Sequence, residues 1–385
     1  MRIIIALASL LCLLVNMSSA QVSTPKYANE YLAIGVGARG LAMSNSQVDI
    51  VDDATAGYWN PAGLLNIKEK YSASLMHASY FAGIANYDFA GFSTNLDKKS
   101  AIGISVIRFA VDDIPDTRYL FDASGNLDYS QVKSFSAADY AFIFSYARRF
   151  PALKDIKFGA NVKVLHRNVG IFANAWGFGF DLGAQTTLGK WNLGITARDI
   201  TGTFTAWRFN SATFYDVFSQ TDNTIPDNSL EVAVPRLLIG GGRNFPILSS
   251  KSKDDVNTPS ILSLLVSVGA DITFDGKRNT VIKTEFGSID PHAGLEFQIY
   301  DVAFVRGGVG MFQYEKDFDG SESLTFQPNF GLGIKLKGIT IDYALTDISD
   351  QSAALYSHVF SIKAGFGVSK NITPRYQRNR DLLYY

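Results

Sequence analysis

Residues 35 to 64 read GVGARGLAMSNSQVDIVDDATAGYWNPAGL, and this stretch differs in character from nearly everything that follows it. It is rich in glycine, lacks a steady two-residue alternation, and ends in Tyr58-Trp59-Asn60-Pro61-Ala62-Gly63-Leu64. Pro61 cannot donate a ladder hydrogen bond, and an Asn-Pro pair favours a turn, so we expect irregular backbone here. At membrane depth such backbone persists only where protein or enclosed water satisfies its polar groups. The stretch therefore predicts a plug, or hatch, enclosed by a barrel.

The rest of the chain alternates in runs of about ten residues, as barrel strands do. From Ile339 to Thr346, for example, the apolar residues Ile339, Ile341, Tyr343 and Leu345 share one face. A soluble β-sandwich, the alternative, favours shorter strands and buries its apolar face. We therefore predict an all-β fold, a transmembrane antiparallel β-barrel of about 14 strands. The expected strands lie near 69–80, 84–95, 100–111, 134–149, 154–168, 173–187, 190–201, 234–246, 260–274, 290–300, 302–314, 324–337, 338–348 and 356–369.

The connections support an even number of strands. Residues 278–288 could form a fifteenth strand, but we assign them to a loop because an even count puts both termini on one side. The even-numbered connections are then mostly short, with 247–259 as an exception, and most odd-numbered ones are long. Barrels of this kind have short periplasmic turns and longer outer loops, so both termini are predicted to be periplasmic.

The N-terminus has the features of a secretory signal peptide. Arg2 supplies a positive charge, Ile3 to Val15 is apolar, and small residues precede a cleavage site after Ala20. About 13 apolar residues are too few for a membrane-spanning helix. The predicted organisation is a signal peptide at 1–20, a hatch at 21–68, an integral outer-membrane barrel in contact with lipid at 69–369 and a basic periplasmic tail at 370–385.

Neither the composition nor the motifs of the sequence indicate catalysis. The formal net charge is −1, which gives no reason to expect a nucleic-acid partner, and the single cysteine, Cys12, lies in the leader. Gly35 to Gly40 matches G-x-G-x-x-G, but no helical period follows it as a dinucleotide site requires. Asp52-Asp53 has no nearby histidine, so we expect it to cap a turn or to pair with a barrel lysine such as Lys157 or Lys163. No nucleophile elbow is visible. We predict no enzyme activity, no cofactor and no metal site.

The N-terminal motif resembles that of a known family. Gly37-Ala38-Arg39-Gly40, then Ala42-Met43, Asp52-Asp53-Ala54 and Trp59-Asn60-Pro61-Ala62-Gly63-Leu64 look like the opening of the PorV/PorQ family. These are FadL-like outer-membrane barrels of fourteen strands associated with type IX secretion. The resemblance is concentrated in residues 35–64, and the strand pattern agrees with it over the rest.

The resemblance implies two functions. A PorV-like component of type IX secretion would bind the C-terminal signal domains of exported cargo and contact the translocon or attachment-complex subunits, with a sealed lumen and an adhesive outer surface. A FadL-like channel would take up hydrophobic small molecules through an apolar pocket between hatch and wall, with a lateral opening. We place the secretion role first and keep the channel as the alternative.

The predicted loop 202–233 is the candidate partner-binding surface, because exposed apolar patches usually mark interaction sites. Loop 112–133, with Tyr119, Phe121 and Tyr129, is expected to form a second wall. Alternatively, loop 202–233 folds inward and caps the lumen. Its six aromatic residues are Phe204, Trp207, Phe209, Phe214, Tyr215 and Phe218.

Overall fold

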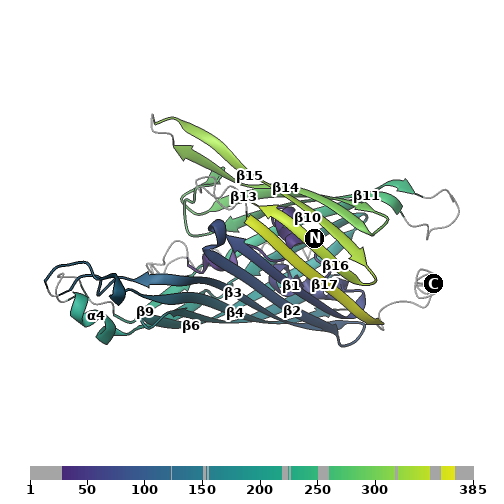
Figure 1. The fold of residues 1–385 in the computed structure, drawn as a ribbon. Helices are drawn as coiled ribbons and strands as arrows, with labels where there is room; N and C mark the ends of the chain where they lie inside the picture. Colours follow the sequence, from purple (N-terminus) through teal and green to yellow (C-terminus); the bar gives the residue numbers. More distant parts are fainter. Residues whose placement is uncertain are drawn as a thin grey trace.

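The chain forms a closed antiparallel β-barrel in a computed structural model (Figure 1). The structure describes residues 28–122, 124–150, 153, 156–218, 224, 227–249, 260–316, 320–346 and 357–368. The predicted signal peptide (1–20) and basic tail (370–385) lie outside these residues. No helix in the described part of the chain is long and apolar enough to cross a membrane.

The barrel wall has fourteen strands among the described residues: β1 to β7, β10, β11 and β13 to β17, with β17 pairing back to β1. The predicted fold class and strand number are confirmed. The wall strands are β1 Glu69–Tyr80, β2 Ala85–Asn95, β3 Ser100–Asp116, β4 Lys133–Arg149, β5 Lys157–Val169, β6 Ala173–Leu188, β7 Trp191–Arg198, β10 Arg236–Ser249, β11 Ser260–Thr273, β13 Ser288–Ile299, β14 Ala303–Lys316, β15 Glu322–Leu336, β16 Ile339–Thr346 and β17 Ser357–Val368.

Two predicted loops contain further regular structure. Residues 202–233, predicted as a long loop, contain regular structure: strand β8 (Thr203–Phe209), helix α4 (Ser211–Phe218) and strand β9 (Ser229–Ala233). Strand β8 pairs with the upper part of β6, and β9 pairs with β8, which extends the sheet beyond the ring. The two-residue strand β12 (Ile282–Lys283) pairs with β13 outside the ring, so residues 278–288 add no wall strand.

The wall separates an apolar exterior from a small and polar interior. Outward side chains such as Ile104, Leu332 and Phe360 are exposed, as a lipid-facing surface requires. The inward positions hold mostly glycine, serine, asparagine and paired charges. A closed ring leaves no free strand edge in the wall, which satisfies the backbone in lipid.

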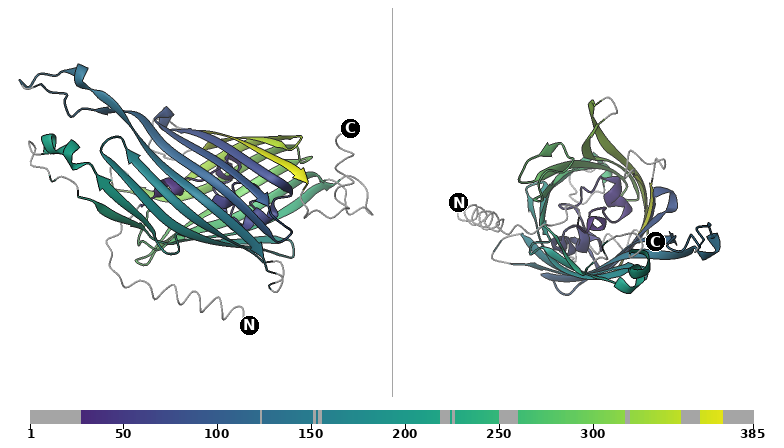
Figure 2. Two further views of the ribbon diagram at one scale, coloured as in Figure 1. Left: turned by 90° about the horizontal axis from the view of Figure 1, so that it is seen from below. Right: turned by 90° about the vertical axis from the view of Figure 1, so that its left-hand side faces the viewer.

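The hatch, residues 28–68, occupies the lumen (Figure 2, right). It contains four short helices: η1 Glu30–Leu32, α2 Ala38–Ala42, α3 Ala56–Trp59 and η2 Pro61–Asn66. Its backbone passes very close to the wall. A Cβ atom on Gly159 would lie 2.4 Å from backbone atoms of Pro61 and Ala62, and one on Gly194 would lie 2.2 Å from the Val48 carbonyl oxygen. Inward glycines of the wall therefore permit this packing.

The hatch runs along the barrel from one end to the other. Near its start, Glu30 accepts hydrogen bonds from Arg236, the first residue of β10, and from Arg278 in the connection between β11 and β13. Both lie at the end of the barrel that carries the extended connections, which we call the long-loop end. The hatch leads into Glu69, where β1 begins at the opposite end.

Candidate functional site

The Asn60-Pro61 turn attaches the hatch to the wall. Asn60 is fully buried, and its side-chain oxygen accepts a hydrogen bond from the amide of Ala62, so it caps the helix η2 that begins at Pro61. Asparagine before proline suits the N-terminus of a helix. The Asn60 side-chain nitrogen lies 2.9 Å from the Val48 carbonyl oxygen within the hatch. It also lies 3.1 and 3.3 Å from carbonyl oxygens of β6 and β7 in the wall.

Trp59, in contrast, packs mainly within the hatch. Its indole nitrogen donates to the Val36 carbonyl oxygen at 3.0 Å, and its ring would meet any side chain placed at Gly35 or Gly40. The wall contacts Trp59 at its backbone, where the Thr196 hydroxyl donates to the Trp59 carbonyl oxygen at 3.1 Å, and at its ring, whose centre lies 6.0 Å from the guanidinium carbon of Arg198. A Cβ atom on Gly63 would lie 2.5 Å from a side-chain carbon of Val51. The motif therefore packs against other hatch residues as well as against the wall.

A series of ion pairs, which we call the ionic chain, joins the hatch to strands β13, β14, β16 and β17 of the wall. Arg39 donates to Glu296 of β13 at 2.9 and 3.1 Å and to Asp52 at 3.1 Å. Glu296 also accepts from Arg306 at 2.6 Å, and Arg306 donates to Asp342 at 2.8 Å. Lys363 and Asp53 are the remaining members.

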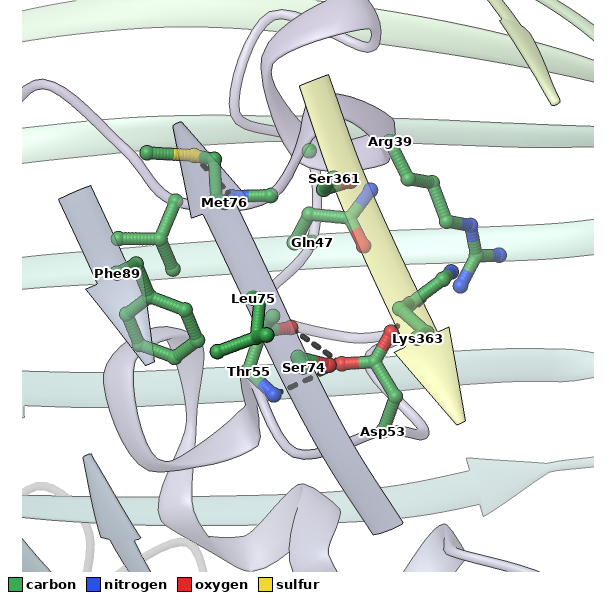
Figure 3. A pocket seen from close by; sticks show the side chains of 13 residues that line it. Arg39, Gln47, Asp53, Thr55, Ser74, Leu75, Met76, Phe89, Ser361 and Lys363 are labelled. Carbon is green, nitrogen blue, oxygen red and sulfur yellow. Dashed lines mark hydrogen bonds and ion pairs between the residues drawn. The ribbon is translucent and has the colours of Figure 1, made fainter. Parts of the chain in front are cut away.

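Lys363 of β17 closes this chain onto the hatch (Figure 3). Its ammonium nitrogen lies 3.2 Å from a carboxylate oxygen of Asp342 and 3.3 Å from one of Asp53. Asp53 therefore pairs with a barrel lysine other than the predicted Lys157 or Lys163. Burial opposes ionisation of Asp53, but attraction to Lys363 and hydrogen bonds from Thr55 outweigh it and lower the pKa of Asp53.

Asp49 is a second buried acid of the hatch, and it lacks a cation partner of this kind. One carboxylate oxygen accepts from the Ser267 hydroxyl at 2.9 Å, while the other has no hydrogen-bond partner among the described residues. Burial raises the pKa of Asp49 to about 6. The carboxyl group thus changes its protonation close to neutral pH.

Two small cavities lie between the hatch and the wall. The cavity beside Arg39, Asp53 and Lys363 has a volume of about 10 Å³, and the one beside Leu32, Lys163 and Arg198 has about 30 Å³. The smaller cavity has room for about one water molecule. Neither of these two cavities is the apolar pocket between hatch and wall that a channel predicts.

A much larger pocket, of about 610 Å³, lies at the long-loop end. Residues of the connection between β3 and β4 line one side, and residues of β8 and α4 line another. Helix α4 and the far ends of β3 and β4 lie at the same end of the barrel (Figure 1). We call it the rim pocket. Its lining residues are Pro115, Asp116, Thr117, Arg118, Phe135, Val169, Phe172, Ala173, Trp207, Phe209, Phe214 and Phe218.

Arg118 holds the two sides of the rim pocket together. Its guanidinium group donates to both carboxylate oxygens of Asp116, at 2.9 and 2.7 Å, and to the Thr213 carbonyl oxygen of α4 at 2.6 Å. Its central carbon also lies 4.5 Å from the centre of the Phe172 ring. The positive charge of Arg118 is therefore already balanced, which leaves the pocket mainly apolar.

The six aromatic residues predicted to bind a partner fall into two groups. Trp207, Phe209, Phe214 and Phe218 line the rim pocket, whereas Phe204 and Tyr215 are exposed on other faces. Tyr119, Phe121 and Tyr129 of the opposite connection are also exposed and are not part of the pocket lining. That connection contributes its base, Pro115 to Arg118, to the pocket wall.

Other residues of the site escaped the sequence analysis. Phe135 lies near the start of β4 and Phe172 in the turn between β5 and β6, and alternation alone does not mark either residue as lining a pocket. Arg167 lies on the inward face of β5, two residues from Val169 of the pocket lining, and contacts both Trp207 and hatch residue Tyr31. Extending the inward alternation of Asn161 and Lys163 by four residues would have found Arg167. Within the described ranges, no cluster of histidine, aspartate and glutamate is arranged to hold a metal ion.

Comparisons with known proteins support the fold. Neither a protein-family model nor a curated protein sequence matches the chain. Among solved structures, the CymD monoaromatic hydrocarbon channel is 13% identical with a TM-score of 0.50, over 87% of this chain and 98% of that one. The Pseudomonas putida toluene transporter TodX is 11% identical with a TM-score of 0.50, over 86% and 96%. These similarities show a shared FadL-like barrel fold.

Proposed function

We propose that this protein is an outer-membrane channel that takes up uncharged hydrophobic molecules, aromatic hydrocarbons in particular, from the outside. The observation that carries the proposal is the rim pocket. Its volume of about 610 Å³ falls within the range of small-molecule sites, and rings of phenylalanine and tryptophan dominate its lining. The similarity in fold to hydrocarbon channels supports the same function.

The charges around the pocket favour an uncharged ligand. Arg118, the cation in the lining, is paired with Asp116. A ligand carboxylate would have to compete with Asp116 for that guanidinium group, whereas a hydrocarbon would contact only the rings. Burying apolar ligand surface against these rings contributes about 25 cal/mol per Å².

Passage through the barrel then requires movement of the hatch. The two described cavities beside the hatch, of about 10 and 30 Å³, are too small for an aromatic ring. The conformation described here is therefore a closed one. A ligand captured at the rim would cross only when contacts between hatch and wall are broken.

Uptake by proteoliposomes tests this proposal. Purified protein is reconstituted, and entry of radiolabelled toluene into a hydrophobic trap inside the liposomes is measured against empty liposomes. We expect Phe214→Ala with Phe209→Ala to slow the protein-dependent uptake at low toluene concentration, because both rings line the pocket. Tyr215→Ala is the matched control, since Tyr215 is exposed outside the lining. If liposomes with wild-type protein take up toluene no faster than empty liposomes, the channel function is refuted.

A secretion component is the second candidate. The closely filled lumen favours it, as do exposed aromatic side chains on the β3–β4 connection, such as Tyr129 at 74% exposure. In this role the outer surface would bind type IX translocon or attachment-complex subunits and the C-terminal domains of cargo. Affinity purification from detergent-solubilised outer membranes, followed by mass spectrometry, tests it. Recovery of the barrel without such partners would count against the secretion role.

A further inference from the structure

Arg167 lies between the rim pocket and the hatch. Its guanidinium group donates two hydrogen bonds to Asp139 of β4, at 2.8 and 3.0 Å, and one to Glu231 of β9 at 3.4 Å. Glu231 also accepts from the indole nitrogen of Trp207 at 2.8 Å. The nitrogen atoms of Arg167 are thus engaged in the plane of the group, which leaves its flat faces for aromatic rings.

Two rings already contact this guanidinium group. Its central carbon lies 4.9 Å from the centre of the Trp207 ring, which lines the rim pocket. It lies 5.9 Å from the centre of the Tyr31 ring, which belongs to the hatch. Tyr31 is otherwise held by a hydrogen bond from its hydroxyl to the Tyr140 carbonyl oxygen at 3.3 Å.

The position of Arg167 makes it the contact that a ligand meets on leaving the pocket. Arg167 and Val169 both face inward on β5, and Val169 lines the pocket while Arg167 lies two residues nearer the lumen. A ligand that moves from the pocket toward the hatch passes the guanidinium group and the Tyr31 ring. An aromatic ring can replace Tyr31 on a guanidinium face through a cation–π interaction, and a saturated ring cannot.

We propose that Arg167 is a specificity-determining residue, which favours aromatic over saturated hydrocarbons by accepting the ligand ring in place of the Tyr31 ring of the hatch. This inference rests on the proposed uptake function. It adds that recognition of the aromatic ring takes place between the pocket and the hatch, and that arrival of the ligand removes the contact of Tyr31 with Arg167, one of the contacts that hold the first helix of the hatch.

Equilibrium binding of toluene and methylcyclohexane, two rings of similar size, tests the proposal. The protein is placed in lipid nanodiscs, and headspace gas chromatography measures the free hydrocarbon, with empty nanodiscs subtracted. Arg167→Lys keeps the positive charge beside Asp139 and Glu231 but removes the flat guanidinium group. We expect it to weaken toluene binding about fivefold, the size of a partly buried cation–π interaction, and to leave methylcyclohexane binding nearly unchanged.

A second variant is expected to change toluene binding in the opposite direction. Tyr31→Leu removes the competing ring, so it should strengthen toluene binding and raise the preference for toluene over methylcyclohexane. Arg208→Lys is the matched control, because Arg208 is exposed on the outer side of β8, and it should change neither ligand. Opposite signs in the two variants cannot come from a general loss of folding.

The outcomes separate this inference from the function on which it rests. If wild-type protein binds neither hydrocarbon above empty nanodiscs, the uptake function fails, and the role of Arg167 fails with it. If wild-type protein binds toluene but Arg167→Lys and Tyr31→Leu leave the toluene preference unchanged, the pocket binds hydrocarbons and Arg167 does not select them. A shift of the preference in opposite directions supports the inference.

Discussion

Replacing Asn60 by aspartate should detach the hatch from the wall at neutral pH. The change keeps the size of the side chain and the oxygen that accepts from the Ala62 amide. It removes the side-chain nitrogen that donates to carbonyl oxygens of Val48, Ala184 and Ile195. A carboxylate would instead point at three carbonyl oxygens in a fully buried position.

The expected magnitude follows from the cost of keeping this carboxyl group neutral. An ordinary aspartate has a pKa of about 3.9, and each unit between that value and the working pH costs about 1.36 kcal/mol. Protonation at pH 7.5 therefore costs about 5 kcal/mol, and the lost donor adds about 1 kcal/mol. Relaxation of the turn recovers part of this, so we expect a loss of about 4 kcal/mol. That loss equals roughly a thousandfold increase in local opening of the hatch.

Hydrogen exchange measured by mass spectrometry reports this opening directly. Amides of residues 56–64 should lose about a thousandfold in protection at pH 7.5 relative to wild type, and most of the loss should disappear near pH 4, where the new carboxyl group is protonated. Asn192→Asp is the control, since Asn192 accepts from Thr187 near a strand end and the change should cost under about 0.5 kcal/mol. Equal protection of residues 56–64 in wild type and Asn60→Asp at pH 7.5 would show that Asn60 does not anchor the hatch.

Three further predictions concern the hatch and the pocket. Deleting residues 35–64 should leave a folded barrel with raised ion conductance in planar bilayers, and unchanged conductance would contradict the role of this segment as a plug. The pKa of Asp49 is raised from 3.8 to about 6, so ionisation favours the unfolded chain: stability should fall by up to about 3 kcal/mol between pH 4 and 6 and stay level above, and Asp49→Asn should flatten the pH profile of the urea midpoint. Parallel profiles would oppose this account. Trp207→Ala with Phe209→Ala should lower ligand or partner binding with nearly unchanged conductance and barrel stability, whereas raised conductance would identify residues 202–233 as a lid.

The wall could be predicted from sequence because its physical constraint is local. Each strand must alternate between lipid and lumen, and runs such as Ile339–Thr346 show this within a few residues. Strand β8 was missed because Thr203–Phe209 alternates over only seven residues amid a dense aromatic segment. Threonine and tryptophan at its inward positions are good strand formers, so the length of the run, and not its composition, hid this strand.

Partners across the lumen could not be predicted in the same way. Arg39 and Glu296 are far apart in sequence, and only the closed ring brings them together. Asp53 was expected to meet Lys157 or Lys163. Lys363, its actual partner, occupies the polar face of its strand just as those two lysines do. The order of the strands and the position of the hatch along the barrel axis decide which lysine reaches Asp53. The alternation of polar and apolar residues within a strand predicts neither of these. The rim pocket likewise could not be predicted, because it forms where the ends of β3 and β4 meet β8 and α4.

The ionic chain also bears on the order of assembly. Its hatch members lie near the start of the polypeptide, whereas Lys363 lies on β17, the strand that pairs with β1 to close the ring. The contact between Lys363 and Asp53 can therefore form only once the final strand has been synthesised and has found the first. Closure of the wall and formation of this last hatch contact are thus a single late event. Until then the hatch can be held only by its contacts with earlier strands, such as those of Asn60 with β6 and β7, while the wall is still open.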